Sequence, residues 1–285
     1  MVTHPQETEG PRAAGAGSPR PRKRTKGAGR ERATNLGITV LVIVAIICVW
    51  WMITALHLVK PLFVPTPLAT WDAFVSTLVN GYQGHSLIVH LLISLRRVSI
   101  AFVLAVLLAV PLGILVGANR RLEAALDPLV NFYRVLPPLA YYTILVIWLG
   151  IGETSKVSLL FLAGFPPIFI AVIDGIRGVP TDRIDAARSL GASNSQVLRA
   201  VIMPSLLPSI FTGMRVALGF TYTTVVAAEM VAADSGIGWM VLDASRYLKS
   251  DVIFMGIIVM GVTGVLLDAA VKYSARRIVP WQGKG

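Results

Sequence analysis

Long apolar runs alternate with shorter polar segments along most of the chain. A helix needs about 17–25 apolar residues to cross the hydrocarbon core of a bilayer, and six runs are at or near that length. They span residues 36–56, 91–117, 129–149, 157–173, 206–231 and 252–273. The pattern therefore predicts an all-α polytopic membrane protein with six transmembrane helices.

The same pattern divides the chain into segments of different character. Residues 1–35 are rich in Arg, Pro, Gly and Ala without apolar periodicity, so we expect a disordered basic tail. The first transmembrane helix follows at 36–56, and it is too long and apolar for a signal peptide. We expect an extracytoplasmic segment at 57–90, a membrane core at 91–275 and a C-terminal tail at 276–285.

One polar segment, residues 178–205, interrupts the membrane core. Its first part predicts a helix from Thr181 to Leu190, with Thr181 as the N-cap and Asp182 favourably placed for the helix dipole. Gly191 is expected to end that helix in the left-handed conformation. The segment therefore indicates two short helices joined at a glycine.

The second of these helices is predicted to begin at Ser193 and to end at Pro204. Ser193 and Gln196 have the spacing of a capping box, and Pro204 cannot continue a regular helix. One face of the helix is apolar and needs an apolar partner. That face carries Val197, Leu198, Val201 and Ile202.

Composition and charge support a membrane protein and give its orientation. The chain is 55% hydrophobic and 14% charged, whereas soluble domains carry about 25% charged residues. With the N-terminus inside, eighteen of the 26 Lys and Arg residues lie on the cytoplasmic side and four outside. The excess of positive charge predicts an N-in, C-in topology, which places residues 178–205 in the cytoplasm.

Motifs for enzymatic chemistry are missing from the sequence. It contains no phosphate loop of the form GxxxxGK[ST], no GxSxG and no HExxH. The single cysteine, Cys48, lies in an apolar run, and the four histidines lack metal-ligand spacing. We therefore expect no enzyme activity, no ATP hydrolysis by this chain, no cofactor and no metal.

Within 178–205, the pattern Ala186-Ala187, Gly191 and Val201-Ile202-Met203-Pro204 resembles the EAA signature of permease subunits of ABC importers. Asp185 stands where that family usually has Glu, and Met203 where it usually has Leu. Residues 134–156, 212–230 and the closing RRIVPWQG are similar to the nitrate/sulfonate/taurine branch of the family, and most to its taurine permeases. The similarity extends from about Val49 to the C-terminus.

This resemblance implies a type I ABC importer permease in a bacterial inner membrane. Two copies of the subunit would form the pathway, two cytoplasmic ATPase subunits would supply energy, and an external binding protein would deliver the solute. Segment 178–205 would dock on the ATPase. The resemblance and the apolar face together assign the coupling role to Asp185, Ala186, Ala187, Gly191, Val197, Leu198, Val201 and Pro204.

Polar and aromatic residues within the spans are candidates for lining a pathway, because such groups are costly in hydrocarbon. The candidates are Tyr133, Arg134, Tyr142, Arg215, Tyr222, Thr224 and Glu229. Each also has a structural interpretation. The two arginines lie within reach of the cytoplasmic headgroups, Glu229 is expected to pair with an arginine, and the Tyr and Thr side chains suit helix packing.

Other functions remain compatible with parts of the sequence. A passive channel would need a polar stripe along the pore and no docking element. The basic tail could bind nucleic acid, although anionic lipid next to a membrane span suits it better. For an importer, taurine or another alkanesulfonate is the favoured solute, with nitrate or a heterocyclic vitamin precursor as alternatives.

Overall fold

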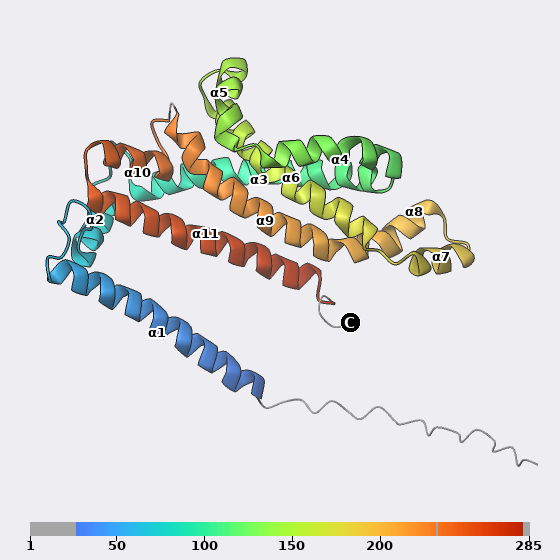
Figure 1. Cartoon of the computed structure of the whole chain (residues 1–285), viewed down its shortest axis with the longest axis horizontal. Helices are drawn as coiled ribbons and strands as arrows, with labels where there is room; N and C mark the ends of the chain where they lie inside the picture. Colours follow the sequence, from blue (N-terminus) through green and yellow to red (C-terminus); the bar gives the residue numbers. More distant parts are fainter. Residues whose placement is uncertain (1–26, 232, 282–285) are drawn as a thin grey trace, which may run out of the picture. The chain divides into compact units, whose positions relative to one another are not determined.

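The computed structural model describes residues 27–231 and 233–281, and these residues contain helices but no strand. The helices are labelled in Figure 1. Their bounds are α1 Gly27–Ala55, α2 Pro67–Val79, α3 Leu87–Gly117, α4 Arg120–Val135, α5 Pro138–Leu149, α6 Glu153–Arg177, α7 Thr181–Ser189, α8 Asn194–Val197, the π-helix η1 Leu198–Ile202, α9 Met203–Met230, α10 Ile237–Arg246 and α11 Ser250–Ile278.

The chain divides into two units, Met1–Val49 and Trp50–Gly285. Helix α1 begins at Gly27, so the expectation of disorder as far as residue 35 is wrong for its last nine residues. The run Arg30 to Ala33 in this stretch consists of residues with high helix propensity. The rest of the expected disordered tail lies outside the described residues. The part of α1 suited to crossing a membrane is Gly37–Ala55.

Three long helices, α3, α6 and α9, pack together at the centre of the second unit (Figure 1). Small residues at their contacts allow the backbones to approach closely. A Cβ added at Gly113 would lie 2.8 Å from the side chain of Val172, and one added at Gly117 would lie 2.9 Å from that of Ile176. These two glycines are therefore positions where helices α3 and α6 pack closely.

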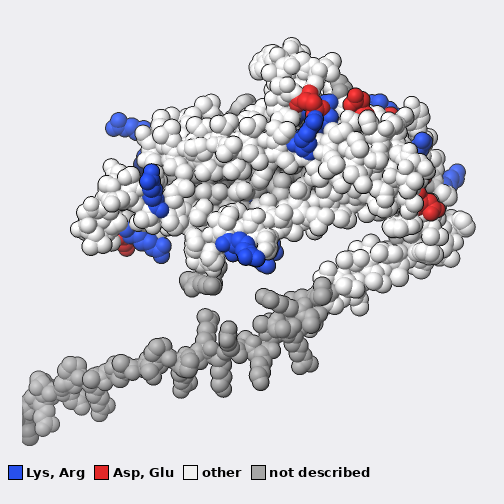
Figure 2. All heavy atoms as spheres, turned by 180° about the vertical axis from the view of Figure 1, so that it is seen from behind, with Lys and Arg blue, Asp and Glu red and all other residues white. Residues whose placement is uncertain are grey.

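Five helices of the described chain are long and apolar enough to cross a membrane, and a bent pair of helices makes six. Helices α3, α6, α9 and α11 contain almost all of the predicted spans 91–117, 157–173, 206–231 and 252–273. They extend beyond those runs because their ends carry polar residues that the apolar pattern leaves out. Large uncharged areas cover the long helices in Figure 2, as expected for a surface that meets lipid.

The predicted third span, residues 129–149, is not one continuous helix. It is divided between α4 and α5, which meet at an angle of 98° across a short break. Pro137 and Pro138 cause the break, because proline lacks an N–H donor and disfavours helical geometry in the residue before it. Leu136 accordingly has an extended backbone conformation.

Candidate functional site

Residues 178–205 are here called the coupling element, after the role expected from the resemblance, and α7 is their first helix. Thr181 is the first helical residue and Pro180 takes the N-cap position, so the prediction of Thr181 as N-cap is wrong. Gly191 has φ +84°, which confirms the left-handed end. Its N–H donates to the carbonyl of Arg188 (2.8 Å), and the N–H of Ala192 donates to that of Ala187 (3.1 Å). This pair of bonds is a Schellman motif, which fixes how the chain leaves α7.

The start of the second helix is also as predicted. The Ser193 hydroxyl accepts from the backbone N–H of Gln196 (3.4 Å), and the Gln196 side chain accepts from the backbone N–H of Ser193 (2.8 Å). The capping box is therefore confirmed. Together with the glycine before it, the box leaves only Ala192 between the two caps, so the connection is short and defined.

The predicted end of that helix at Pro204 is wrong. Helix α8 continues through η1 into α9 without a break, and Pro204 lies in the first turn of α9. A proline ring crowds the carbonyl four residues before it, here that of Ala200. The wider π-turn accommodates the proline, and within it the N–H of Met203 donates to the carbonyl of Leu198.

The coupling element covers its apolar face within the chain and leaves its tip exposed. Val197 is buried, and Leu198, Val201 and Ile202 are half-buried beside α7 and α9. Leu190 in contrast is 89% exposed, and Asp185 and Ala186 are exposed as well. Contacts within the chain therefore hold α8 and η1 in place, while α7 and the residue after it leave a small, partly apolar surface exposed.

An ion cluster lies at the other end of the long helices. It is formed by Arg97, Glu229 and Ser94, which are buried, and by Glu153, which is exposed, and it is here called the buried ion cluster. Arg97 on α3 is 2% exposed and donates to Glu229 on α9 (2.8 Å) and to Glu153 at the start of α6 (2.5 and 2.9 Å). Glu229 is fully buried and also accepts from Ser94 (2.7 Å). One guanidinium therefore joins the three central helices.

The same cluster holds the loop between α9 and α10. The second carboxylate oxygen of Glu229 accepts the backbone N–H groups of Gly238 (2.8 Å) and Trp239 (3.3 Å). Arg97 donates to the carbonyl of Ser235 (2.9 Å), and Ser94 accepts the N–H of Ile237 (2.9 Å). Charged partners make these hydrogen bonds stronger than neutral ones, so the loop is fixed to the helices.

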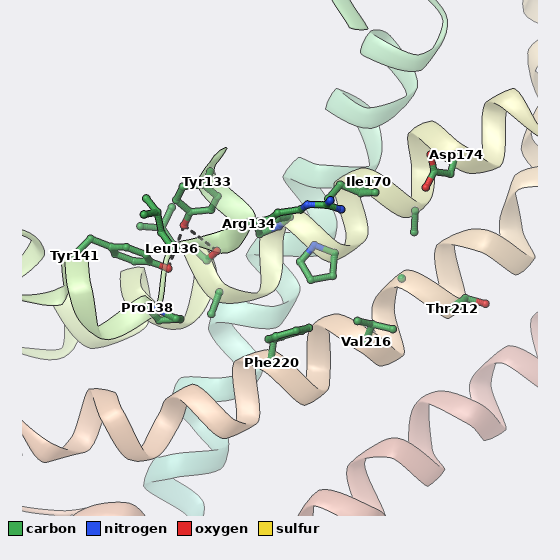
Figure 3. Close-up of a pocket in the computed structure, with 16 residues that line it drawn as sticks. Tyr133, Arg134, Leu136, Pro138, Tyr141, Ile170, Asp174, Thr212, Val216 and Phe220 are labelled. Carbon is green, nitrogen blue, oxygen red and sulfur yellow. Dashed lines mark hydrogen bonds between the residues drawn. The ribbon is translucent and has the colours of Figure 1, made fainter. Parts of the chain in front are cut away.

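A pocket of about 390 Å³, here called the central pocket, lies between the α4–α5 bend, α6 and α9. Figure 3 shows Tyr133, Leu136, Pro138 and Tyr141 on one side and Val216 and Phe220 on the other, with Asp174 and Thr212 at one end. The Tyr133 hydroxyl donates to the carbonyl of Leu162 (3.0 Å) and lies 3.3 Å from the Tyr141 hydroxyl. The walls are mostly apolar, and polar groups lie at a few points.

The central pocket includes two of the seven predicted pathway residues, Tyr133 and Arg134. Arg215 instead forms a bidentate ion pair with Asp268 on α11 (2.8 and 2.9 Å). The Tyr222 hydroxyl donates to the carbonyl of Met260 (2.9 Å). Both side chains therefore link α9 to α11 and do not line this pocket.

Three further candidates are buried in helix packing. Tyr142 is 2% exposed and donates to the carbonyl of Ala228 (3.0 Å), and Thr224 donates to that of Phe220 (2.7 Å). Glu229 belongs to the buried ion cluster, which confirms its pairing with an arginine. None of the three lines the central pocket, and their assignment to a pathway stays a prediction.

Sequence reasoning missed Asp174 and Arg97 as site residues. The predicted fourth span ends at Ile173, which left Asp174 in the following loop, whereas α6 continues to Arg177. Asp174 could have been found by considering ionisable residues within one helical turn of the end of a predicted span. Arg97 lies within the predicted span 91–117, but its partners are 56 and 132 positions away in sequence and no local pattern reveals them.

These features define a multi-pass helical membrane protein with a pocket between its spans and a capped helical element at one end. The family model described as binding-protein-dependent transport system inner membrane component matches residues 109–280. The chain belongs to this family. Members are the permease subunits of ABC importers, so the chain is a transport subunit and not an enzyme.

Two named relatives and one solved structure support this assignment. The taurine transport system permease protein TauC of Escherichia coli (strain K12) is 42% identical over 240 residues, which cover 84% of this chain and 87% of that protein. The bicarbonate transport system permease protein CmpB of Synechococcus elongatus is 37% identical over 187 residues, 65% of this chain and 67% of that one.

The solved structure shows the same fold. A chain of the inward-facing MetNI methionine ABC transporter is 21% identical, with a TM-score of 0.55, and the match covers 66% of this chain and 91% of that chain. The architecture is therefore that of an ABC importer permease.

Proposed function

We propose that this permease imports taurine or another alkanesulfonate. The similarity to a taurine permease over most of both chains carries the proposal. The central pocket supports it, because mostly apolar walls with a few polar groups suit a small organic ion. Similarity to a bicarbonate permease keeps a small inorganic anion such as nitrate as the second candidate.

The proposed assembly contains two copies of this chain, two cytoplasmic ATPase subunits and an external binding protein, with both chain termini in the cytoplasm. The coupling element would dock on the ATPase through the exposed surface of α7. Its continuity with α9 supports this role, because a displacement of α7 and α8 passes through η1 into a transmembrane helix without a flexible joint.

Reconstitution of the permease with its ATPase and binding protein in proteoliposomes tests the substrate. We expect ATP-driven uptake of taurine or ethanesulfonate that exceeds uptake of nitrate. Uptake of nitrate alone would replace the first candidate by the second. Solute flux through the permease without ATPase and ATP would instead indicate a passive channel.

Two substitutions test the coupling element. Gly191→Pro is incompatible with φ +84°, because proline fixes φ near about −65°. Ala187→Arg places a long cation at a half-buried position of α7. We expect normal membrane levels and loss of ATP-driven uptake for both, whereas Ala187→Ser keeps a small side chain and uptake. Normal uptake by the arginine variant would contradict the docking role.

A further inference from the structure

The central pocket contains two opposite charges that are weakly compensated within the chain. Arg134 lies in the last turn of α4, and no carboxylate of the described chain lies within 4.0 Å of it. Asp174 has one ion pair, with Arg177 at 3.8 Å, and Arg177 makes a shorter one with Glu123. Both pocket charges therefore keep most of their capacity to bind a ligand.

Helix ends act in opposite ways on these two charges. The C-terminal end of a helix carries partial negative charge, which stabilises a cation and disfavours an anion. Arg134 in the last turn of α4 is thus stabilised, and Asp174 in the last turn of α6 lacks such support. A cation bound at Asp174 would relieve the unfavourable interaction.

The position of the two groups suits one ligand that carries both charges. Figure 3 shows the Arg134 side chain extending along α6 past Ile170 in the direction of Asp174. Among the described residues that line the central pocket, these two are the ionic ones. Apart from Thr212, the remaining lining residues are apolar or aromatic. They include Tyr141 and Phe220, and aromatic ring faces attract a ligand ammonium group.

We propose that Arg134 and Asp174 form a two-point site for a zwitterion within the permease. The guanidinium of Arg134 binds the sulfonate or other acid group through its planar set of N–H donors. The carboxylate of Asp174 accepts hydrogen bonds from the ammonium group. The inference rests on the proposed function and adds that the permease itself selects a zwitterion over a simple anion.

Binding to the purified permease–ATPase complex in lipid nanodiscs, without the binding protein, tests the site. The probes are radiolabelled taurine and two competitors, ethanesulfonate, which lacks the ammonium, and ethylamine, which lacks the acid group. Removal of one charged hydrogen-bond partner is expected to weaken binding by about tenfold or more. Asp174→Asn should weaken taurine binding by that factor and leave ethanesulfonate binding unchanged.

Arg134→Gln should weaken taurine and ethanesulfonate to a similar extent and leave ethylamine unaffected. Arg134→Lys and Asp174→Glu keep the charges and should each lose less taurine affinity than Arg134→Gln and Asp174→Asn, which separates loss of the site from loss of the fold. Asp243→Asn, outside the pocket, is the matched control and should bind as the unmodified protein does.

Two results would overturn the inference. One is unchanged taurine affinity in Asp174→Asn, and the other is the absence of taurine binding by the unmodified complex. ATP-driven taurine uptake by the complete unmodified transporter is measured in parallel. Uptake together with either of these results removes the two-point site and leaves the proposed function in place, whereas the absence of uptake of both taurine and ethanesulfonate removes the proposed function.

Discussion

Replacement of Glu229 by glutamine should destabilise this protein more than any other exchange of an acid for its amide outside the coupling element. Glu229 is fully buried, and each of its carboxylate oxygens accepts two hydrogen bonds. Ser94 and Arg97 donate to one oxygen, and the N–H groups of Gly238 and Trp239 donate to the other. All four partners are donors, so a carboxylate suits the site and an amide does not.

The magnitude follows from this arrangement. In either orientation of the glutamine, its NH₂ group faces two donors, and Arg97 keeps its buried charge with one carboxylate partner fewer. Removal of one partner from a buried ion pair costs about 3–5 kcal/mol. Because Glu153 still compensates Arg97, we expect the free energy of unfolding to fall by about 3 kcal/mol, the lower end of that range. At about 2–4 °C per kcal/mol, the melting temperature should fall by about 6–12 °C.

The assay is the melting temperature of the purified permease in detergent, measured as the fraction that remains monodisperse after heating. Asp243→Asn is the control, because Asp243 is half-buried and accepts one short bond, from Tyr82 (2.9 Å). Burial and this bond raise the pKa of Tyr82, so the phenol keeps its proton and donates equally to an amide oxygen. The control should lose less than about 1 kcal/mol. Equal shifts for the two variants would refute the argument from buried charge.

Two pairs of glycine substitutions give contrasting predictions. Gly191→Ala and Gly219→Ala both add a methyl group in open space, but of these two glycines only Gly191 has a positive φ. Gly191→Ala should therefore destabilise the coupling element by about 1 kcal/mol and slow uptake. Gly219→Ala in α9 should be neutral or stabilising. Gly213→Ala should cost about 1–3 kcal/mol in the same melting assay, because its Cβ would lie 2.6 Å from that of Ala171. Gly261→Ala, with no atom within 4 Å, is its control, and equal melting temperatures would contradict close packing of α6 against α9.

Local sequence patterns predict much of this structure. The apolar runs locate α3, α6, α9 and α11, since each helix buries one side and presents the other to lipid. Gly191 and the pair Ser193 and Gln196 predict the two caps of the coupling element, because a cap depends on residues within one turn of each other. Where the physical cause lies within a few residues, the sequence is sufficient.

The features that the sequence did not reveal depend on distant partners or on a balance between local tendencies. The 98° bend after α4 reflects competition between two prolines and an apolar run that favours one straight span. Arg97 and Glu229 meet only after α3 and α9 have packed together. The central pocket likewise combines residues from α4, α5, α6 and α9, so the residues that line it could not be inferred from residue type.

The π-turn at Leu198–Ile202 sets the angular position of the coupling element about the axis of α9. Each residue of an α-helix turns the chain by about 100°, and a π-turn accommodates one residue more than an α-turn does. Loss of a single residue from this stretch would leave α8 joined to α9 but would swing the exposed Leu190 by roughly a quarter of a revolution or more. The length of this turn, and not only its sequence, therefore decides which way the surface of α7 faces.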